Sequence, residues 1–346
     1  MAIKIIISLM LLAALKLLFG SSSVADNSTL VPIDKVWWDN LSEEWKTILL
    51  VNQNFQKQHI DIFKLQEEYI NRLNEKDEAG CSEINKSLHE LNELKRFSLG
   101  YPDLYARAIR TNHVVKNENI DLATLANLDT IYMVNGPADL SPLQQFPHLK
   151  VLIINYCGLA DGSEQIDLKP LKYLKELKVL HCSSPAIKSL PIEGLVNLEE
   201  LNCDNSSIAN LAPLKKLVNL KLLSVGKIKD ASAISQLENL EALYIDGCKQ
   251  VPSLSRLKKL KKLYISEGEL SIINAGYRLT NIDFLASFKD LEDLDLGYTS
   301  YKGSLNVLNQ LQHLKAVTLP PVSKSEMRSF KQSNPHCVII NSFSYE

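Results

Sequence analysis

The residues best suited to chemistry lie around His181 and Cys182. Cys157 and Cys203 flank this pair in the sequence, and an imidazole nitrogen with cysteine thiolates is a ligand set that zinc favours. Alternation along a strand, however, would point His181 away from Cys182 and Cys203, so the sequence predicts no metal site. No Ser/His/Asp arrangement, paired-carboxylate motif or glycine-rich phosphate loop emerges, so we expect no catalytic residues and no cofactor.

The chain contains six cysteines. Cys182 and Cys203 occupy equivalent positions of neighbouring sequence units and could form a disulfide, but we favour buried free thiols. Cys81 and Cys337 lie near opposite ends of the chain, too far apart to pair within one molecule.

A second group of residues has the composition of a binding surface. It combines tyrosines with acidic side chains, and tyrosine brings a large contact area at a low entropic cost. We call it the tyrosine–acid cluster; we expect its tyrosines to be exposed, and its members are Tyr244, Asp246, Tyr264, Glu267, Asp293, Asp295 and Tyr298, with Tyr277 and Arg278 in an adjacent insertion. The simpler alternative is that tyrosine suits a strand.

A repeated pattern of apolar residues must position these side chains. The template Leu-x-x-Leu-x-Leu, with any apolar residue allowed, recurs at spacings of 20 to 34 residues. Its first leucines are Leu94, Leu128, Leu149, Leu177, Leu198, Leu220, Leu240, Leu260, Leu291 and Leu314. The apolar fourth and sixth positions indicate a short strand with one buried face.

The residues between these strands must return the chain so that the next strand lies parallel to the last. Return segments such as IDLKPLKYL carry a second set of leucines that can fill the space behind the sheet. No unit can bury its apolar face alone, so the sequence predicts an α/β solenoid, a curved stack with parallel strands on its concave face. The third, fifth, seventh and eighth template positions then point away from the core.

Charges at the second template position support this register. They alternate in sign except at two adjacent lysines, and stacked strands would bring opposite charges together. These residues are Asp129, Lys150, Lys178, Glu199, Lys221, Glu241, Lys261, Glu292 and Lys315.

The units over residues 94–319, with their I-x-x-L-x-P-L-x-x-L return segments, resemble bacterial leucine-rich repeats of the internalin-like class. In this family an asparagine is expected three residues after the sixth template position. Here other residues replace it, for example Gly136, Cys157, Ser206 and Thr299. An asparagine ladder at that position is therefore largely missing. The resemblance implies recognition of another macromolecule through the concave face and the edge that bears the insertions.

Both ends of a solenoid need caps. Residues 26–93 lack the repeat and are predicted to form a helical cap, with Ser42 capping a helix and further helices around 59–75 and 82–95. Trp37, Trp38 and Trp45 are expected to pack on the first repeat, and a carbohydrate-stacking platform is the alternative. Residues 320–346 are predicted to form a helix-strand cap, with a capping box at Ser323 and Glu326 and a last strand from Cys337 to Ile340. The resemblance also implies that the chain ends with this cap and carries no catalytic domain.

The first 25 residues have the features of a secretory signal peptide. A lysine precedes an apolar run, and Ser23-Val24-Ala25 offers a cleavage site. An uncleaved anchor is the alternative, although the run is short and broken by Lys16. Loss of Lys4 and Lys16 changes the formal charge from −2 to −4, which argues against nucleic-acid binding. No stable membrane span is expected after cleavage.

We therefore expect a secreted, periplasmic or cell-surface protein that binds a protein partner and is not an enzyme. The first alternative is a glycan-binding adhesin that uses Tyr244, Tyr264 and Tyr298 as stacking platforms. The second is a hydrolase or transferase hidden in the N-terminal 60 or so residues, which are too few for capping helices and a substrate cleft.

Overall fold

The computed structural model describes residues 33–57, 122–134, 136–155, 157, 165–226, 232–247, 254–266 and 279–341. The chain divides into two compact units, Met1–Leu128 and Asp129–Glu346. Each unit is described by itself. The predicted strand at Leu94 and the predicted helices around 59–75 and 82–95 fall outside the described residues.

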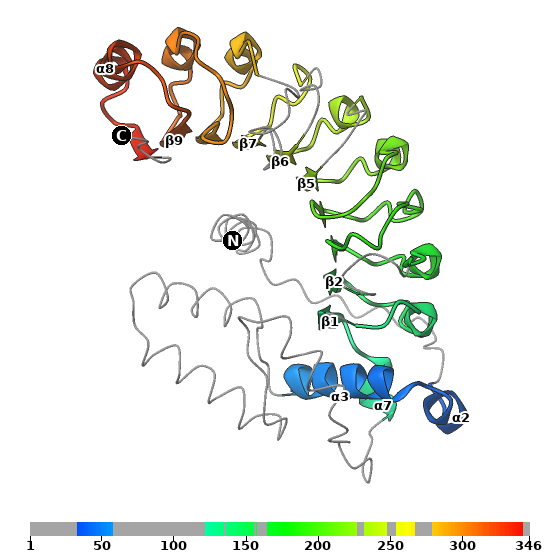
Figure 1. The fold of residues 1–346 in the computed structure, drawn as a ribbon. Helices are drawn as coiled ribbons and strands as arrows, with labels where there is room; N and C mark the ends of the chain where they lie inside the picture. The colour runs from blue at the N-terminus through cyan, green and yellow to red at the C-terminus, as the bar shows by residue number, and fades with distance from the viewer. Residues whose placement is uncertain are drawn as a thin grey trace, which may run out of the picture. The chain divides into compact units, whose positions relative to one another are not determined.

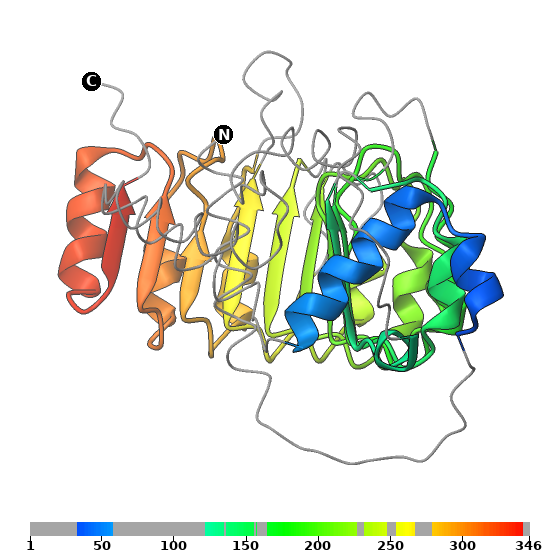
Figure 2. The same cartoon turned by 90° about the horizontal axis from the view of Figure 1, so that it is seen from below.

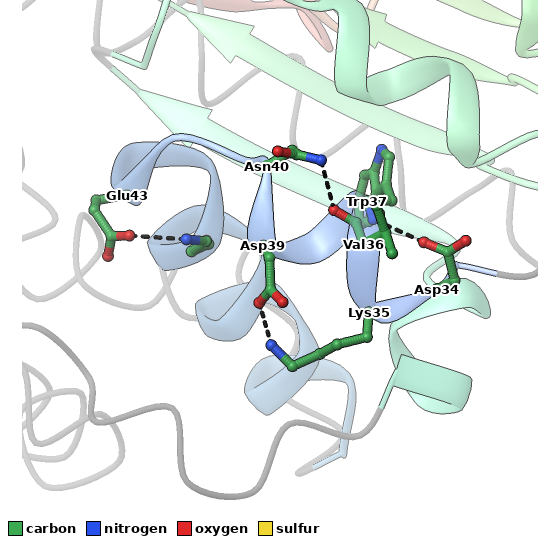
Figure 3. A network of polar contacts seen from close by, with 8 residues as sticks. Asp34, Lys35, Val36, Trp37, Asp39, Asn40 and Glu43 are labelled. Carbon is green, nitrogen blue, oxygen red and sulfur yellow. Dashed lines mark hydrogen bonds and ion pairs between the residues drawn. The ribbon is translucent and has the colours of Figure 1, made fainter.

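The first unit contains three short described helices, α2 (Lys35–Asp39), α3 (Glu43–Lys57) and α7 (Leu122–Ala126). Asp34 begins α2 by accepting the backbone N–H of Trp37 at 2.7 Å, and Asn40 ends it by donating to the carbonyl of Val36 at 2.9 Å (Figure 3). An ion pair between Lys35 and Asp39 spans one turn of the same helix.

The predicted cap of α3 is confirmed, because the Ser42 hydroxyl accepts the backbone N–H of Trp45 at 3.2 Å. Trp38 and Trp45 are buried, with 1% and 2% of their surface exposed. Gln56 on α3 donates to the carbonyl of Asn127 at 3.0 Å, which ties α3 to the segment that follows α7. The burial of Trp38 and Trp45 agrees with a packing role for these two tryptophans, whereas Trp37 is half-buried.

The second unit is a ten-stranded parallel sheet in which the strands follow chain order from β1 to β10. Within this unit the strands line the inner side of an arc and the return segments form its outer side (Figure 1). Figure 2 shows the strands lying side by side. The strands are β1 (Thr130–Val134), β2 (Val151–Asn155), β3 (Val179–His181), β4 (Glu200–Cys203), β5 (Leu222–Gly226), β6 (Ala242–Asp246), β7 (Lys262–Ser266), β8 (Asp293–Asp295), β9 (Ala316–Leu319) and β10 (Val338–Asn341).

The predicted register is confirmed. Leu201 pairs with Leu223 and Leu223 with Leu243, so equivalent template positions are immediate neighbours. The first leucines of the described repeats, from Leu128 to Leu314, are at most 1% exposed. Burying these leucines between neighbouring repeats is the main stabilising contribution of each repeat interface, at about 25 cal/mol per Å² of apolar surface.

Six of the return segments form 3-10 helices, which contribute leucines to the second layer of the core. They are η1 (Ser141–Gln145), η2 (Lys169–Tyr173), η3 (Ala212–Lys216), η4 (Ile234–Gln236), η5 (Asp283–Ser287) and η6 (Asn306–Gln310). Before several of them an Asp or Asn side chain accepts a backbone N–H two residues ahead, as Asp139 does from Ser141 at 2.9 Å. Proline in the first turn then fixes the backbone for the helix.

The C-terminal cap also matches its prediction. Helix α8 (Lys324–Ser333) begins where the Ser323 hydroxyl accepts the backbone N–H of Glu326 at 3.2 Å, and β10 pairs with β9. The Glu326 carboxylate accepts the backbone N–H of Leu305 at 2.8 Å, a contact with the preceding repeat that the capping-box prediction did not include.

Candidate functional site

The concave face of the second unit is built from the third and fifth template positions of consecutive strands. Backbone pairing places the fifth-position residues in one row across the sheet, and the row includes Ser224, Tyr244, Tyr264, Asp295 and Thr318. The third-position row beside it includes Ala242, Lys262, Asp293 and Ala316. The structure thus brings five residues of the tyrosine–acid cluster together on β6, β7 and β8: Tyr244, Tyr264, Asp293 and Asp295 lie in these two rows, and Asp246 lies at the end of β6.

The expectation that Tyr244 and Tyr264 are exposed is wrong. They are 3% and 4% exposed, and their ring centroids lie 6.3 Å apart. Parallel strands only about 4.8 Å apart let large side chains of neighbouring strands cover one another. Burial is the main reason that the pKa of each phenol is raised. The negative charge of Asp293 raises the pKa of Tyr244 further, and that of Asp295 raises the pKa of Tyr264 further.

The described carboxylates of the cluster are more accessible than Tyr244 and Tyr264. The Asp293 side chain is 39% exposed, and its Oδ2 lies 3.3 Å from the Lys262 ammonium nitrogen. Asp246, Asp295 and Tyr298 are half-buried. Glu267, Tyr277 and Arg278 fall outside the described residues, as do most residues of the insertions at 157–168 and 267–285, which lengthen the repeats that begin at Leu149 and Leu260.

Asp295 is held in an unusual electrostatic state. Burial raises the pKa of its carboxyl to about 6, although the backbone N–H of Gly297 and the Thr318 side chain oppose this change. The Gly297 N–H donates to Asp295 Oδ1 at 2.8 Å. This carboxyl therefore changes charge near pH 6, within the row of fifth-position side chains.

We expect Asp295→Asn to flatten the pH dependence of stability between pH 4 and pH 6. In this interval wild-type Asp295 keeps its proton when folded and loses it when unfolded, so the free energy of unfolding falls as pH rises. The asparagine variant lacks this titration and should be more stable above pH 6 by about 2 kcal/mol. Urea denaturation at pH 4, 5, 6 and 7 measures the difference, and equal slopes in both proteins would contradict it.

A second polar group lies on β3 and β4. His181 Nε2 is 2.5 Å from Glu200 Oε1, with Glu200 fully buried and His181 7% exposed. The other Glu200 oxygen, Oε2, has no hydrogen-bond partner. As predicted, His181 lies on the opposite side of its strand from Cys182, which is fully buried in the core.

Polar side chains also connect the ends of β2, β3 and β4. The Ser183 hydroxyl lies 2.9 Å from Asn202 Oδ1 and 2.5 Å from Asp204 Oδ1, and the Ser183 N–H donates to Asn155 Oδ1 at 3.1 Å. A hydroxyl has one proton to donate, so Asn202 and Asp204 compete for it. This network holds three neighbouring repeats together at the concave face.

The predicted charge alternation is confirmed at the edge where the strands begin. Glu199 pairs with Lys178 at 3.1 Å and with Lys221 at 2.6 Å, and the pattern continues with Lys261–Glu241 and Lys315–Glu292, each at 2.7 Å. Burial alone would raise the pKa of Glu199. Hydrogen bonds and charge from Lys221 and Lys178 outweigh burial and hold this pKa below its usual value. These exposed or half-exposed pairs contribute little stability each.

The sequence analysis missed an asparagine ladder at this same edge. The side-chain amides of Asn197, Asn219 and Asn239 donate to carbonyls of the preceding repeat, those of Lys175, Val196 and Val218, at 2.8–2.9 Å. The sequence signal for this ladder is the asparagine that directly precedes the first leucine of the template in VNLEEL, VNLKLL and ENLEAL. Side chains of this asparagine ladder and of the alternating charged residues line a groove of about 510 Å³.

At the position where the family's asparagine was expected, hydroxyls take over. Ser206 and Thr299 each donate to the carbonyl three residues earlier, at 2.7 Å. Each bond closes a turn within its own repeat, so these turns need no bond to the neighbouring repeat.

The described cysteines, Cys157, Cys182, Cys203 and Cys337, are free and buried, which confirms the prediction for Cys182 and Cys203. Hydrogen bonding to Cys182 and then burial raise the pKa of the Cys203 thiol. Within the described ranges, no group of three or more His, Cys, Asp or Glu side chains could hold a metal ion. In the same ranges no helix is both long and apolar enough to cross a membrane.

A curved parallel sheet with short 3-10 return segments and leucines stacked at a fixed period defines a leucine-rich-repeat protein. The chain belongs to this family: a family model described as "Leucine-rich repeat region" matches residues 127–336, more than half of the chain. That model describes a repeat region and not a catalytic domain. A comparison with curated proteins finds no significant match.

Among solved structures, the chain is similar to Listeria monocytogenes internalins. For the internalin InlF the identity is 20% and the TM-score 0.46, with 65% of this chain and 72% of that chain covered. For internalin C2 the identity is 20% and the TM-score 0.39, with 59% and 84% covered. A leucine-rich-repeat protein of Leptospira interrogans has 21% identity and a TM-score of 0.45, with 57% and 56% covered. Similarity at this level says nothing about binding or activity.

Proposed function

We propose that this protein recognises another protein through its concave face, and that it is not an enzyme. The observation that supports this most directly is a group of accessible charged side chains on the neighbouring strands β6 to β8, namely Asp246, Lys262, Asp293 and Asp295. Hydrogen bonds between repeats fix the sheet that carries these side chains, so little conformational entropy is lost when a partner binds.

A glycan-binding role has weaker support. Sugar rings stack on open aromatic faces, whereas Tyr244 and Tyr264 are 3% and 4% exposed and Tyr298 is half-buried. Carboxylates are the accessible groups instead, and they favour a partner that supplies positive charge and hydrogen-bond donors.

Site-specific photo-cross-linking tests the concave face. A photoreactive amino acid at position 246 or 293 should capture one discrete protein from cells that contain the natural partner. The same amino acid at position 188 or 215, where exposed lysines lie outside the strands, should not. Equal capture from both sets of positions would place recognition elsewhere.

We also propose that the protein is exported and that residues 1–25 are removed. The supporting feature is the lysine, apolar run and Ser23-Val24-Ala25 in the sequence. The N-terminal sequence of protein recovered from the medium, periplasm or cell surface should begin at Asp26. A retained Met1 would identify an uncleaved anchor.

A further inference from the structure

The last three strands of the sheet bring acidic and apolar side chains onto one surface. Backbone pairing aligns Asp293 on β8 with Ala316 and Val338, and Asp295 with Thr318 and Ile340. The two carboxylates therefore lie two strands away from Val338 and Ile340, on the same face. Two inter-strand spacings amount to about 10 Å.

The apolar half of this surface is unusual for the molecule. Val338 and Ile340 are 62% and 45% exposed, and they are the only strand residues among the large exposed apolar side chains in the described ranges. Apolar residues at the same template positions on other strands, such as Ile153 and Leu222, are 1% exposed. Exposed aliphatic side chains that adjoin polar groups are typical of a binding surface.

The acidic half of this surface consists of two carboxylates on one strand. The Asp293 side chain is 39% exposed and Asp295 is half-buried, so a partner can reach both of them. Lys262 lies 3.3 Å from Asp293 and neutralises part of its charge, so the two carboxylates of β8 carry more negative charge than this one lysine offsets. An arginine from a partner could donate to several such acceptors at once, because its guanidinium carries five N–H groups.

We propose that the concave surface of β8 to β10, formed by Asp293, Asp295, Val338 and Ile340, binds a protein segment that carries an arginine and an aliphatic side chain about 10 Å apart. This inference rests on the proposed function and specifies the chemistry of the partner. The arginine pairs with the two carboxylates and the aliphatic side chain covers Val338 and Ile340. Ala316 and Thr318 form the floor between them.

The spacing limits the backbone of the bound segment. In a polyproline II helix, residues three apart lie on the same side and about 9 Å from each other. In a strand, residues three apart point to opposite sides. A segment with the pattern Arg-x-x-Leu in polyproline II conformation therefore matches both contacts.

Synthetic peptides test this pattern. Biotinylated proline-rich peptides with Arg-Pro-Pro-Leu or the reverse order, Leu-Pro-Pro-Arg, are immobilised on a streptavidin sensor, and binding of the purified protein is measured. At least one order should bind about tenfold more tightly than its counterpart with glutamate in place of arginine. Removing one proline should weaken binding by a similar factor, and raising the salt concentration should weaken it several-fold.

Two double variants connect the binding to this surface. Asp293→Asn with Asp295→Asn, and Val338→Thr with Ile340→Thr, should each weaken binding about tenfold. The matched apolar control is Val196→Thr with Val218→Thr, which changes side chains that are 48% and 57% exposed outside the strands. The acidic control is Glu193→Gln with Asp290→Asn, both exposed.

The inference is overturned if no peptide binds, if the arginine and glutamate peptides bind equally, or if the controls weaken binding as much as the site variants do. Photo-cross-linking from position 293 would still capture a partner in the first two cases if the proposed function is right. The two ideas therefore fail separately.

Discussion

Replacing His181 with alanine is expected to lower the free energy of unfolding by about 3–5 kcal/mol. Glu200 is fully buried, and its recorded hydrogen bond is the 2.5 Å contact between Oε1 and His181 Nε2. Without the imidazole, the carboxylate stays in an apolar environment with neither oxygen paired, which is far more costly than losing the contact itself. Urea denaturation at pH 7 gives the magnitude.

An exposed pair of the same chemistry provides the control. His148 Nδ1 lies 2.6 Å from Glu176 Oε1, with side chains 28% and 47% exposed. His148→Ala should cost less than about 1 kcal/mol because water can solvate Glu176. The double variant His181→Leu with Glu200→Leu should recover most of the stability that His181→Ala loses. Similar losses for His181→Ala and His148→Ala would mean that Glu200 is not buried as described.

The second large effect is expected at Gly226, at the end of β5. A Cβ atom added there would lie 2.1 Å from the backbone carbonyl oxygen of Asp204, the residue that follows β4. Backbone cannot move aside as a flexible side chain can, so Gly226→Ala should force β4 and β5 apart. We expect a loss of about 3 kcal/mol in the free energy of unfolding, at the upper end of overpacking effects.

Gly194→Ala is the matched control in the same solenoid. The nearest atom to its added Cβ is the Lys175 ammonium nitrogen at 2.8 Å, at the end of a flexible side chain. This variant should change stability by less than about 0.5 kcal/mol. Thermal denaturation of both variants decides the matter, and a Gly226→Ala protein as stable as Gly194→Ala would show that β4 and β5 are not this close.

The repeat itself was predictable because burial acts in the same way on every copy. Leu198, Leu220 and Leu240 recur at a period that only stacked repeats can satisfy, and each is fully buried. The alternating charges at Glu199 and Lys221 indicate the same register, because stacked repeats bring them together. Local signals also sufficed for the Ser42 and Ser323 caps, since each depends on a few adjacent residues.

Side-chain depth on the concave face was not predictable in the same way. Alternation along β6 and β7 says that Tyr244 and Tyr264 point away from the core, but not how far neighbouring strands cover them. Their exposure depends on side chains twenty or more residues away, such as Asp295, whose own protonation depends on burial. The sequence pattern does not predict the pairing of His181 with Glu200, because His181 is at the fifth template position of one repeat and Glu200 is at the third position of the next.

Disulfide trapping on β9 and β10 tests most directly the register on which the concave face depends. In a background without the native cysteines, Thr318→Cys with Ile340→Cys should form a disulfide rapidly under mild oxidation, because these residues are paired neighbours. Thr318→Cys with Val338→Cys should not, because a diagonal separation of about 8 Å exceeds disulfide reach. Faster cross-linking of the second pair, measured by peptide mapping, would contradict the register and remove Asp295, Thr318 and Ile340 from a common row.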